Sequence, residues 1–567
     1  MFSQYRGPPG TSRITPSSLR ERCGRSGLLR ASPCFDGIDP GACLSISCGR
    51  DRGSARSTAS VLAAMTPVLA AMIWVVIAAG CAVGPRYHKP EAPANAGYAP
   101  TPLPEASASA PVHGGDVQRF ISGRDLPFEW WQLFQSPALD ALVAQAFKAN
   151  PTVTAAQAAL AQAQELVRAQ RGFFFPTVGA GFQAERVKVA GNNTQSSSLG
   201  IQANGNNLGQ PVQAAVPLYY RFFTAQLSVG FVPDVFGANR RQVESLAAQT
   251  DAQRFALEAT YITLASNIVA AAIQEASVRA QIEATRQIIA ADEKSLAILR
   301  DQFRLGFAMR IDVAAQEAAL AQAETLLPPL QTQLEQSRDL IRALVGNLPN
   351  QEASQTFEFG ALQLPPEVPL SLPAKIIEQR PDVRAAEAQL HAANAQVGVA
   401  VAAMLPQFSI NGTLGGAADQ IPWLFRGGGP FWTITGGVSQ PIFEGGTLLH
   451  TKRAADAALK QAATQYQSTV IAAYQNVADT LHASLSDADA LAGAVEAENA
   501  SKVTCDLTRR QVEAGYVNYL ALLSAETAYN QALLTRVQAQ ATRYGDSIAL
   551  FQALGGGWWN RKEVAAK

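Results

Sequence analysis

Residues 380–390 read RPDVRAAEAQL, and residues 150–160, which lie 230 positions earlier in the chain, read NPTVTAAQAAL. The two stretches share a proline, a valine, three alanines and a leucine at matching positions. In each copy a second proline, Pro176 or Pro406, follows the first after 25 residues. Alanine-rich helices can resemble one another by chance, but an equal proline spacing in both copies favours an internal repeat.

The residues that follow the second proline of each copy alternate between apolar residues and polar residues or glycine. A period of two predicts β-strands with one apolar face. We expect four strands of about ten residues, the length that crosses an outer membrane when a strand is tilted. For any one strand alone, a soluble β-core is the alternative, because alternation over so few residues is a weak signal. The segments lie at 178–184, 223–231, 408–414 and 432–438, and aromatic residues expected to form an interfacial girdle lie close by at Tyr219, Tyr220, Phe222, Phe223, Trp423, Phe425, Phe431 and Trp432.

Two segments predict very long helices. Residues 238–305 run for 68 positions without glycine or proline, and residues 447–514 run for another 68 with Gly493 as the only exception. At about 1.5 Å per residue, each helix could extend roughly 100 Å. Their many Ala and Gln residues permit close packing but supply only a narrow apolar stripe. Short strands joined to such helices do not predict a globular domain, and they favour a tube with a solvated lumen.

The N-terminal part of the chain carries an export signal. Residues 61–77, VLAAMTPVLAAMIWVVI, form an apolar run that two arginines precede and the residues AAGC follow, ending at Cys81. Small residues directly before a cysteine resemble the bacterial lipobox, which predicts that Cys81 is lipidated and that the mature chain begins there. A membrane-spanning helix with an incidental cysteine is the alternative, since the run is close to the minimum length for crossing a bilayer.

Composition argues against nucleic-acid binding and catalysis. From residue 81 onward the chain has 36 basic and 41 acidic residues, and no glycine loop of the phosphate-binding type is present. The five histidines are scattered without the spacing of a metal site or a catalytic triad. We therefore expect no enzyme activity, no cofactor, no metal site and no nucleic-acid partner.

From about residue 81 to 559 the chain resembles the TolC-type outer membrane efflux family, in its NodT-type lipoprotein branch. The resemblance implies a homotrimer that is mainly α-helical, with four transmembrane strands per chain forming a membrane β-barrel part and long helical hairpins forming a periplasmic tunnel. It also implies the exit duct of a tripartite pump, with a periplasmic adaptor, an inner-membrane transporter, commonly of the resistance-nodulation-division class, and outer membrane lipid as partners. The stretches that carry it are CAVGPRYHKP at 81–90, FEWWQLFQSPALDALVAQAFKANP at 128–151, FVPDVFGANRR at 231–241, QPIFEGG at 440–446, GYVNYLALLSAE at 515–526 and LFQALGGGWW at 550–559.

Two other functions fit parts of the same pattern. An outer membrane channel for protein secretion would have the same fold. A periplasmic adaptor lipoprotein would also have a lipidated cysteine, but with a single helical hairpin. The expected organisation is a disordered or wrongly assigned leader at 1–60, a signal peptide at 61–80, an extended N-terminal segment with its lipid anchor at 81–130, a first efflux repeat at 131–346, a linker at 347–370, a second efflux repeat at 371–559 and a C-terminal tail at 560–567.

Glycines mark the expected ends of the two long helices. Gly306 and Gly515 follow Pro233 and Pro441 by 73 and 74 residues, where each hairpin should turn at its periplasmic tip. The alternative is that both glycines are simple helix terminators with no role in gating. The resemblance implies that the second turn lies at the closed end of the pore, with Leu520 in an apolar ring. The expected tip and gate residues are Gly306, Arg310, Asp312, Gly515, Asn518, Tyr519 and Leu520, while Ser524 and Thr527 replace an Asp and an Arg that are common in the family.

Overall fold

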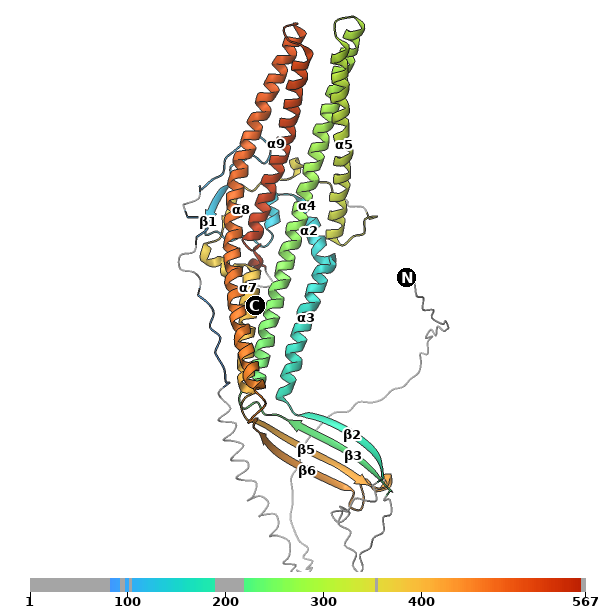
Figure 1. Cartoon of the computed structure of the whole chain (residues 1–567), viewed down its shortest axis with the longest axis vertical. Coiled ribbons are helices and arrows are strands. Elements are labelled where there is room, and N and C mark those ends of the chain that lie inside the picture. Colours follow the sequence, from blue (N-terminus) through green and yellow to red (C-terminus); the bar gives the residue numbers. More distant parts are fainter. Residues whose placement is uncertain (1–81, 92–96, 101–103, 189–218, 352–354, 562–567) are drawn as a thin grey trace, which may run out of the picture. The chain divides into compact units, whose positions relative to one another are not determined.

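Long helices of the chain end on a four-stranded sheet (Figure 1). This computed structural model describes residues 82–91, 97–100, 104–188, 219–351 and 355–561. The expected leader, the signal peptide, Cys81 and most of the C-terminal tail lie outside the described residues, as do residues 189–218, the loop between the first two strands of this sheet.

The two longest helices correspond to the two segments that lack proline. They are α4, Ala238–Arg304, and α8, Thr447–Glu513, of 67 residues each. Each begins after a glycine in the left-handed region, Gly237 at φ 80° and Gly446 at φ 88°. A Cβ on Gly237 would lie 2.7 Å from the side chain of Ala82, so close packing as well as backbone conformation requires glycine there.

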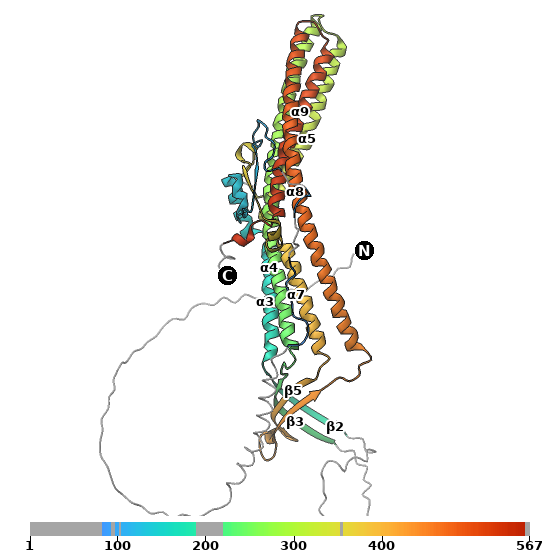
Figure 2. The same ribbon diagram turned by 90° about the vertical axis from the view of Figure 1, so that its left-hand side faces the viewer.

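Shorter helices pack along α4 and α8. In the first repeat α3 (Pro151–Arg171) leads into the sheet and α5 (Arg310–Val345) returns from the tip. Their counterparts in the second repeat are α7 (Pro381–Ala402) and α9 (Tyr519–Ala553). Helix α4 contacts α3, α5, α7 and α9, whereas α8 contacts α7 and α9 (Figure 2). The remaining helices are α2 (Pro137–Ala149) and α6 (Ile376–Gln379), with 3-10 turns η1 (Trp130–Phe134), η2 (Gly172–Phe174), η4 (Phe359–Ala361), η5 (Pro373–Lys375), η6 (Ile421–Trp423) and η7 (Trp558–Asn560).

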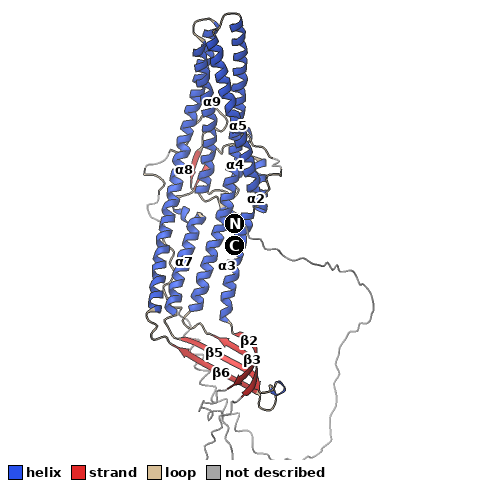
Figure 3. Cartoon of the chain, turned by 45° about the vertical axis from the view of Figure 1, so that its right-hand side comes forward, coloured by secondary structure: helices blue, strands red, loops and turns tan. Residues whose placement is uncertain are grey.

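The sheet joins strands of both repeats. Its order is β2-β3-β5-β6, and every neighbouring pair is antiparallel (Figure 3). Within the described part of the chain, the outer edges of β2 and β6 have no strand partner. Each of the four strands contains one of the predicted alternating segments and extends beyond it, namely β2 at Thr177–Lys188, β3 at Tyr219–Phe231, β5 at Gln407–Ala418 and β6 at Pro430–Ser439.

A second, smaller sheet lies beside the middle of the helices. Strand β1 (Arg119–Ser122) pairs in parallel with β4 (Glu367–Leu370). These strands come from segments that the sequence analysis describes only as extended or as a linker. The main hydrophobic core lies next to them. It is built from η1, α2 and the long helices α4, α5, α8 and α9, with Trp130, Phe134 and Phe551 fully buried.

Candidate functional site

The two faces of the four-stranded sheet differ in polarity. One row of paired residues runs from Ala180 through Leu227 and Leu414 to Trp432, and all of these lie on one face. The last three side chains are 48%, 59% and 70% exposed. The neighbouring row, Gly179, Ser228, Thr413 and Thr433, lies on the opposite face, because successive residues of a strand point to opposite sides.

Further large apolar side chains on this face are exposed, namely Val178, Phe182, Ile434 and Val438. Soluble proteins rarely expose a continuous apolar patch of this kind, so the face needs an apolar environment. The polar face satisfies its hydroxyl groups locally, for example between Thr413 Oγ1 and Thr433 Oγ1 at 2.5 Å. A sheet with one apolar and one polar face matches a wall between lipid and water.

Both long hairpins turn at the glycines that the sequence singles out. Gly306 and Gly515 have φ values of 82° and 79°, and each follows the last turn of a long helix. The residues after them, Phe307 and Tyr516, donate backbone hydrogen bonds of 2.8 Å to carbonyls five positions earlier in both cases. The two tips therefore share one helix-ending geometry, which requires a residue that tolerates positive φ.

Near the tips, a chain of hydrogen bonds connects the two hairpins. The Tyr519 hydroxyl, at the start of α9, donates to Oε1 of Gln316 in α5 at 2.8 Å. Gln316 is fully buried, and its Nε2 donates at 3.2 Å to both the backbone carbonyl and Oδ1 of Asp292 in α4. Burial, followed by the charges of Glu526 and Asp292, raises the pKa of Tyr519. The phenol therefore stays protonated and able to donate.

Apolar packing and a half-buried ion pair lie beside this contact. The Tyr519 ring packs on a cluster formed by Leu296, Leu299 and Val313 of the first hairpin. Glu526 is 8% exposed and accepts a hydrogen bond of 3.1 Å from Arg509, its partner across the second hairpin. Burial raises the pKa of Glu526, and the hydrogen bond and charge of Arg509 offset part of this rise.

The other expected tip residues interact within their own hairpins. Asn518 caps α9, with its side-chain oxygen accepting from the Ala521 amide at 3.1 Å. Asp312 accepts from the Met309 amide at 3.1 Å, and Arg310 lies 3.5 Å from Glu317. Leu520 is 44% exposed. Among the described residues, Arg310 and Asp312 make their hydrogen bonds within the first hairpin, and Gln316 provides the polar contact to the second hairpin.

Sequence reasoning missed Gln316, Asp292 and Glu526. Gln316 lies one turn after Asp312 on the same helix, so the helical spacing from an expected tip residue was the available signal. Glu526 ends the quoted stretch 515–526 without any sign in the sequence that it is buried, and Asp292 belongs to no motif. They are buried acids in otherwise alanine-rich helices, and only the packing of the two hairpins brings them together.

The first described residues lie where the helices meet the sheet. The Val83 amide donates to the Phe236 carbonyl at 3.1 Å, and Arg241 Nε donates to the Val83 carbonyl at 3.1 Å. Ala82 packs against Gly237, directly before α4. The residue that follows Cys81 in the sequence is thus held at the sheet end of the helices.

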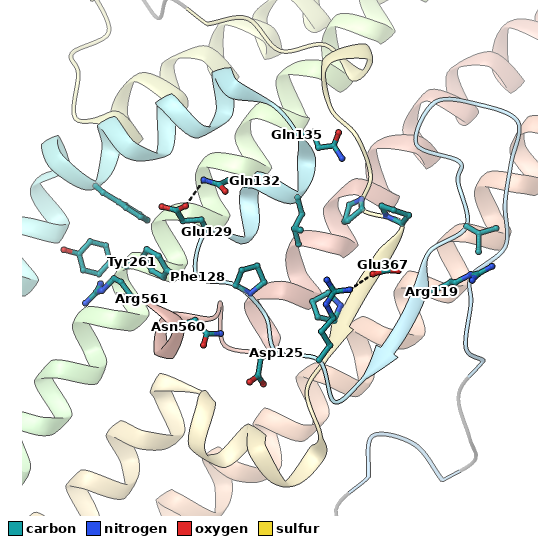
Figure 4. Close-up of a pocket in the computed structure, with 18 residues that line it drawn as sticks. Arg119, Asp125, Phe128, Glu129, Gln132, Gln135, Tyr261, Glu367, Asn560 and Arg561 are labelled. Atoms are coloured by element: carbon teal, nitrogen blue, oxygen red, sulfur yellow. Dashed lines mark hydrogen bonds and ion pairs between the residues drawn. The ribbon is translucent and has the colours of Figure 1, made fainter. Parts of the chain in front are cut away.

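A groove of about 1470 Å³ lies beside the small sheet (Figure 4). Arg561 lies over the rings of Phe128 and Tyr261, at 5.5 and 5.1 Å from their centroids, and pairs with Glu258 at 2.7 Å. Gln135, at φ 52°, is the one non-glycine residue with positive φ among the described residues. No group of three or more His, Cys, Asp or Glu side chains that could hold a metal gathers in the described ranges.

The sequence is similar to a known protein family and to individual members of it. The outer membrane efflux protein family matches residues 142–347 and 372–556, which is more than half of the chain. The pyoverdine export outer membrane protein OpmQ of Pseudomonas putida is 26% identical over 459 residues, covering 81% of this chain and 94% of that protein. The toluene efflux pump outer membrane protein TtgC of Pseudomonas putida is 26% identical over 495 residues, covering 87% of this chain and 96% of that protein.

Solved structures show the same fold. The outer-membrane channel OprN superposes with a TM-score of 0.71 at 25% identity, covering 84% of this chain and 100% of that one. The CmeC outer membrane channel of Campylobacter jejuni superposes with a TM-score of 0.74 at 20% identity, covering 86% and 97%. The fold and the two-faced sheet thus define an efflux channel protein of the outer membrane. The chain belongs to the outer membrane efflux protein family.

Proposed function

We propose that three copies of this chain form the exit channel of a tripartite efflux pump, in which an inner-membrane transporter and a periplasmic adaptor deliver small molecules. The observation that carries the proposal is the sheet with one apolar face, one polar face and two unpaired edges in the described chain. Unpaired backbone groups in lipid cost several kcal/mol each, so the edges of β2 and β6 need partners. Copies of the same chain supply them if β6 of one pairs with β2 of the next.

The strand count favours three copies. Two chains would supply eight strands, and a barrel of that size is filled by its own side chains. Three chains supply twelve strands and leave room for a pore lined by the polar face. The internal repeat gives each chain two helical hairpins, so a trimer surrounds its lumen with six.

The lipid anchor belongs to the same proposal. Ala82 and Val83 are fixed at the junction of helices and sheet, which is the level of the membrane surface if the sheet lies in the outer membrane. A lipid on Cys81, one residue earlier, would then reach the bilayer without unfolding the segment that follows. We therefore retain Cys81 as the proposed lipidation site.

The tips are proposed as the periplasmic gate and docking end. Leu520 is placed on the lumen side, as the family resemblance implies, and Tyr519 holds α9 against the first hairpin through Gln316. Exposed apolar side chains lie in and beside the turns, including Phe307 and Tyr516, each 83% exposed, and would suit contact with the adaptor. The relatives named above belong by their names to pyoverdine export and to a toluene efflux pump, which favours small molecules over protein as cargo.

The proposal is tested by fractionation followed by reconstitution. The protein should separate with the outer membrane, resist extraction without detergent, and form single channels in planar bilayers whose resting conductance is low. An adaptor lipoprotein would produce no conductance. A channel with a permanently high conductance would contradict a closed tip, while leaving the outer membrane assignment intact.

A further inference from the structure

The two repeats enter their long helices through comparable turns of different length. Residues 233–237, here named the first turn, connect β3 to α4, and residues 441–446, the second turn, connect β6 to α8. The starts of α4 and α8 lie 209 positions apart, as do Gly306 and Gly515, whereas Pro233 and Pro441 lie 208 apart. The second turn is therefore one residue longer. Its apolar residues are Ile442 and Phe443, where the first turn has Val235 and Phe236.

The first turn is seated on the other repeat of its own chain. Phe236 lies 6.3 Å, between ring centroids, from Phe408 at the start of β5. The surface that receives it spans residues 399–408, here named the second junction, where α7 leads into β5. Ala402 of that junction is fully buried. Val235 and Phe236 of the first turn are half-buried. A cavity of about 370 Å³ between turn and junction is lined by both, and also by Gln170 and Phe173 at the end of α3.

The second turn and the counterpart of the second junction in the first repeat both carry exposed apolar side chains. In the second turn Ile442 is 94% exposed and Phe443 is 88% exposed. The repeat offset of 230 makes residues 169–178, here named the first junction, the counterpart of the second junction. Its apolar side chains Phe173, Phe175 and Val178 are 63%, 70% and 70% exposed. The second turn therefore lies uncovered at one edge of the chain, and the first junction lies at the other edge, where only its start, at Gln170 and Phe173, borders the first turn.

We infer that the second turn of one copy docks on the first junction of the next copy, with Phe443 as the apolar plug. The inference rests on the proposed assembly of copies around an axis. A head-to-tail interface needs two different surfaces that complement each other, and the contact between the first turn and the second junction is the template for it. The docking site lies directly beside the edges of β6 and β2, so one movement of the neighbouring copy would complete both contacts.

Charge supports this pairing. Glu444 lies in the second turn and is exposed, while the last turn of α3, which leads into the first junction, carries Arg168 and Arg171. Arg168 pairs with Glu165 at the helix surface. The acidic turn and the basic helix end have opposite signs, which favours this register over a contact between two first junctions or two second turns.

The direct test is photochemical. A photoreactive benzoyl-phenylalanine in place of Phe443 should, on irradiation of the assembled protein in mild detergent, cross-link to residues 166–178 of another copy. Mixed assemblies of two differently tagged chains distinguish links between copies from links within one. A cross-link confined to the same chain, or one to another region of the neighbour, overturns the inference. The same probe in place of Phe307, which is 83% exposed at the far tip, is the matched control and should not label residues 166–178.

Stability provides the second arm. Phe443→Ala should lower the temperature at which the assembly dissociates by several degrees, whereas Phe307→Ala should leave it unchanged. Equal behaviour of the two variants, with wild-type trimers present, would refute the docking inference alone. Wild-type protein that does not assemble at all would instead refute the proposed trimer, so the two failures are distinguishable.

Discussion

The hydroxyl of Tyr519 in α9 and the side-chain amide of Gln316 in α5 are hydrogen-bonded at 2.8 Å, although they lie 203 residues apart in the sequence. This bond joins the second hairpin to the first, close to both turns. Gln316 is completely buried, so water cannot replace the tyrosine if it is removed. This hydrogen bond therefore connects the two hairpins at the tip, and breaking it should cost a measurable amount of free energy.

Replacing Tyr519 by Phe should loosen the tip. The change leaves Oε1 of the buried Gln316 without its donor, which costs about 1–3 kcal/mol. We expect a higher resting conductance in planar bilayers than for wild type. Tyr516→Phe is the matched control, because that ring is 83% exposed and its substitution should not alter conductance. Equal resting conductance of Tyr519→Phe and wild type would mean that the bond does not restrain the gate.

Leu520→Ala tests whether apolar packing closes the pore. With three copies, the substitution removes three leucine side chains from the proposed ring, and resting conductance should increase. Asp312→Ala, measured in parallel, removes the carboxylate that accepts from the Met309 amide in the capping box of α5 and should have the smaller effect on conductance. An unchanged Leu520→Ala channel together with a more conductive Asp312→Ala channel would assign closure to charge and capping.

Cys81→Ala should abolish incorporation of a labelled fatty acid. The mature chain expected from the sequence contains one other cysteine, Cys505, which is 3% exposed within α8, so Cys505→Ala should retain the label. Channels should still form without the lipid, because the sheet itself inserts. Label found in Cys81→Ala would refute this residue as the lipidation site.

Two carboxyl groups between α8 and α9 should make stability depend on pH. Burial, followed by the hydrogen bond to Asp487 and the charge of Asp487, raises the pKa of Asp546 to about 8. An unfolded Asp has a pKa of about 3.9, so the folded protein holds the extra proton, and stability declines as pH rises from about 4 through about 8. Asp546→Asn should therefore raise the thermal unfolding midpoint at pH 8.5 and change it little at pH 5. Parallel pH curves for the two proteins would rule out this coupling.

Much of the fold follows from local patterns. Strands alternate in polarity, and helices of 67 residues need long stretches without proline, so both are readable from sequence. Glycine at positions 306 and 515 marks the turns because left-handed backbone favours it. Strand β6 begins at Pro430, two residues before the predicted segment, since pairing with Gly416 extends it.

Contacts between distant segments could not be predicted in the same way. The pairing of β1 with β4 joins residues about 250 positions apart, and neither four-residue segment alternates clearly. Gln316 looks like any polar residue on a helix until the second hairpin covers it. The spacings of 73 and 74 residues show one extra residue after Pro441, but only the helix starts place it in the turn before α8.

The central claim, that copies of this chain close one channel, is tested most directly by the mass of the intact assembly in mild detergent. Native mass spectrometry should give an assembly of three chains. In that assembly the edges of β2 and β6 should be paired between copies, so that hydrogen exchange finds their amides protected. A stable monomer whose edge strands are equally protected would contradict the account, because one chain would then satisfy its own edges.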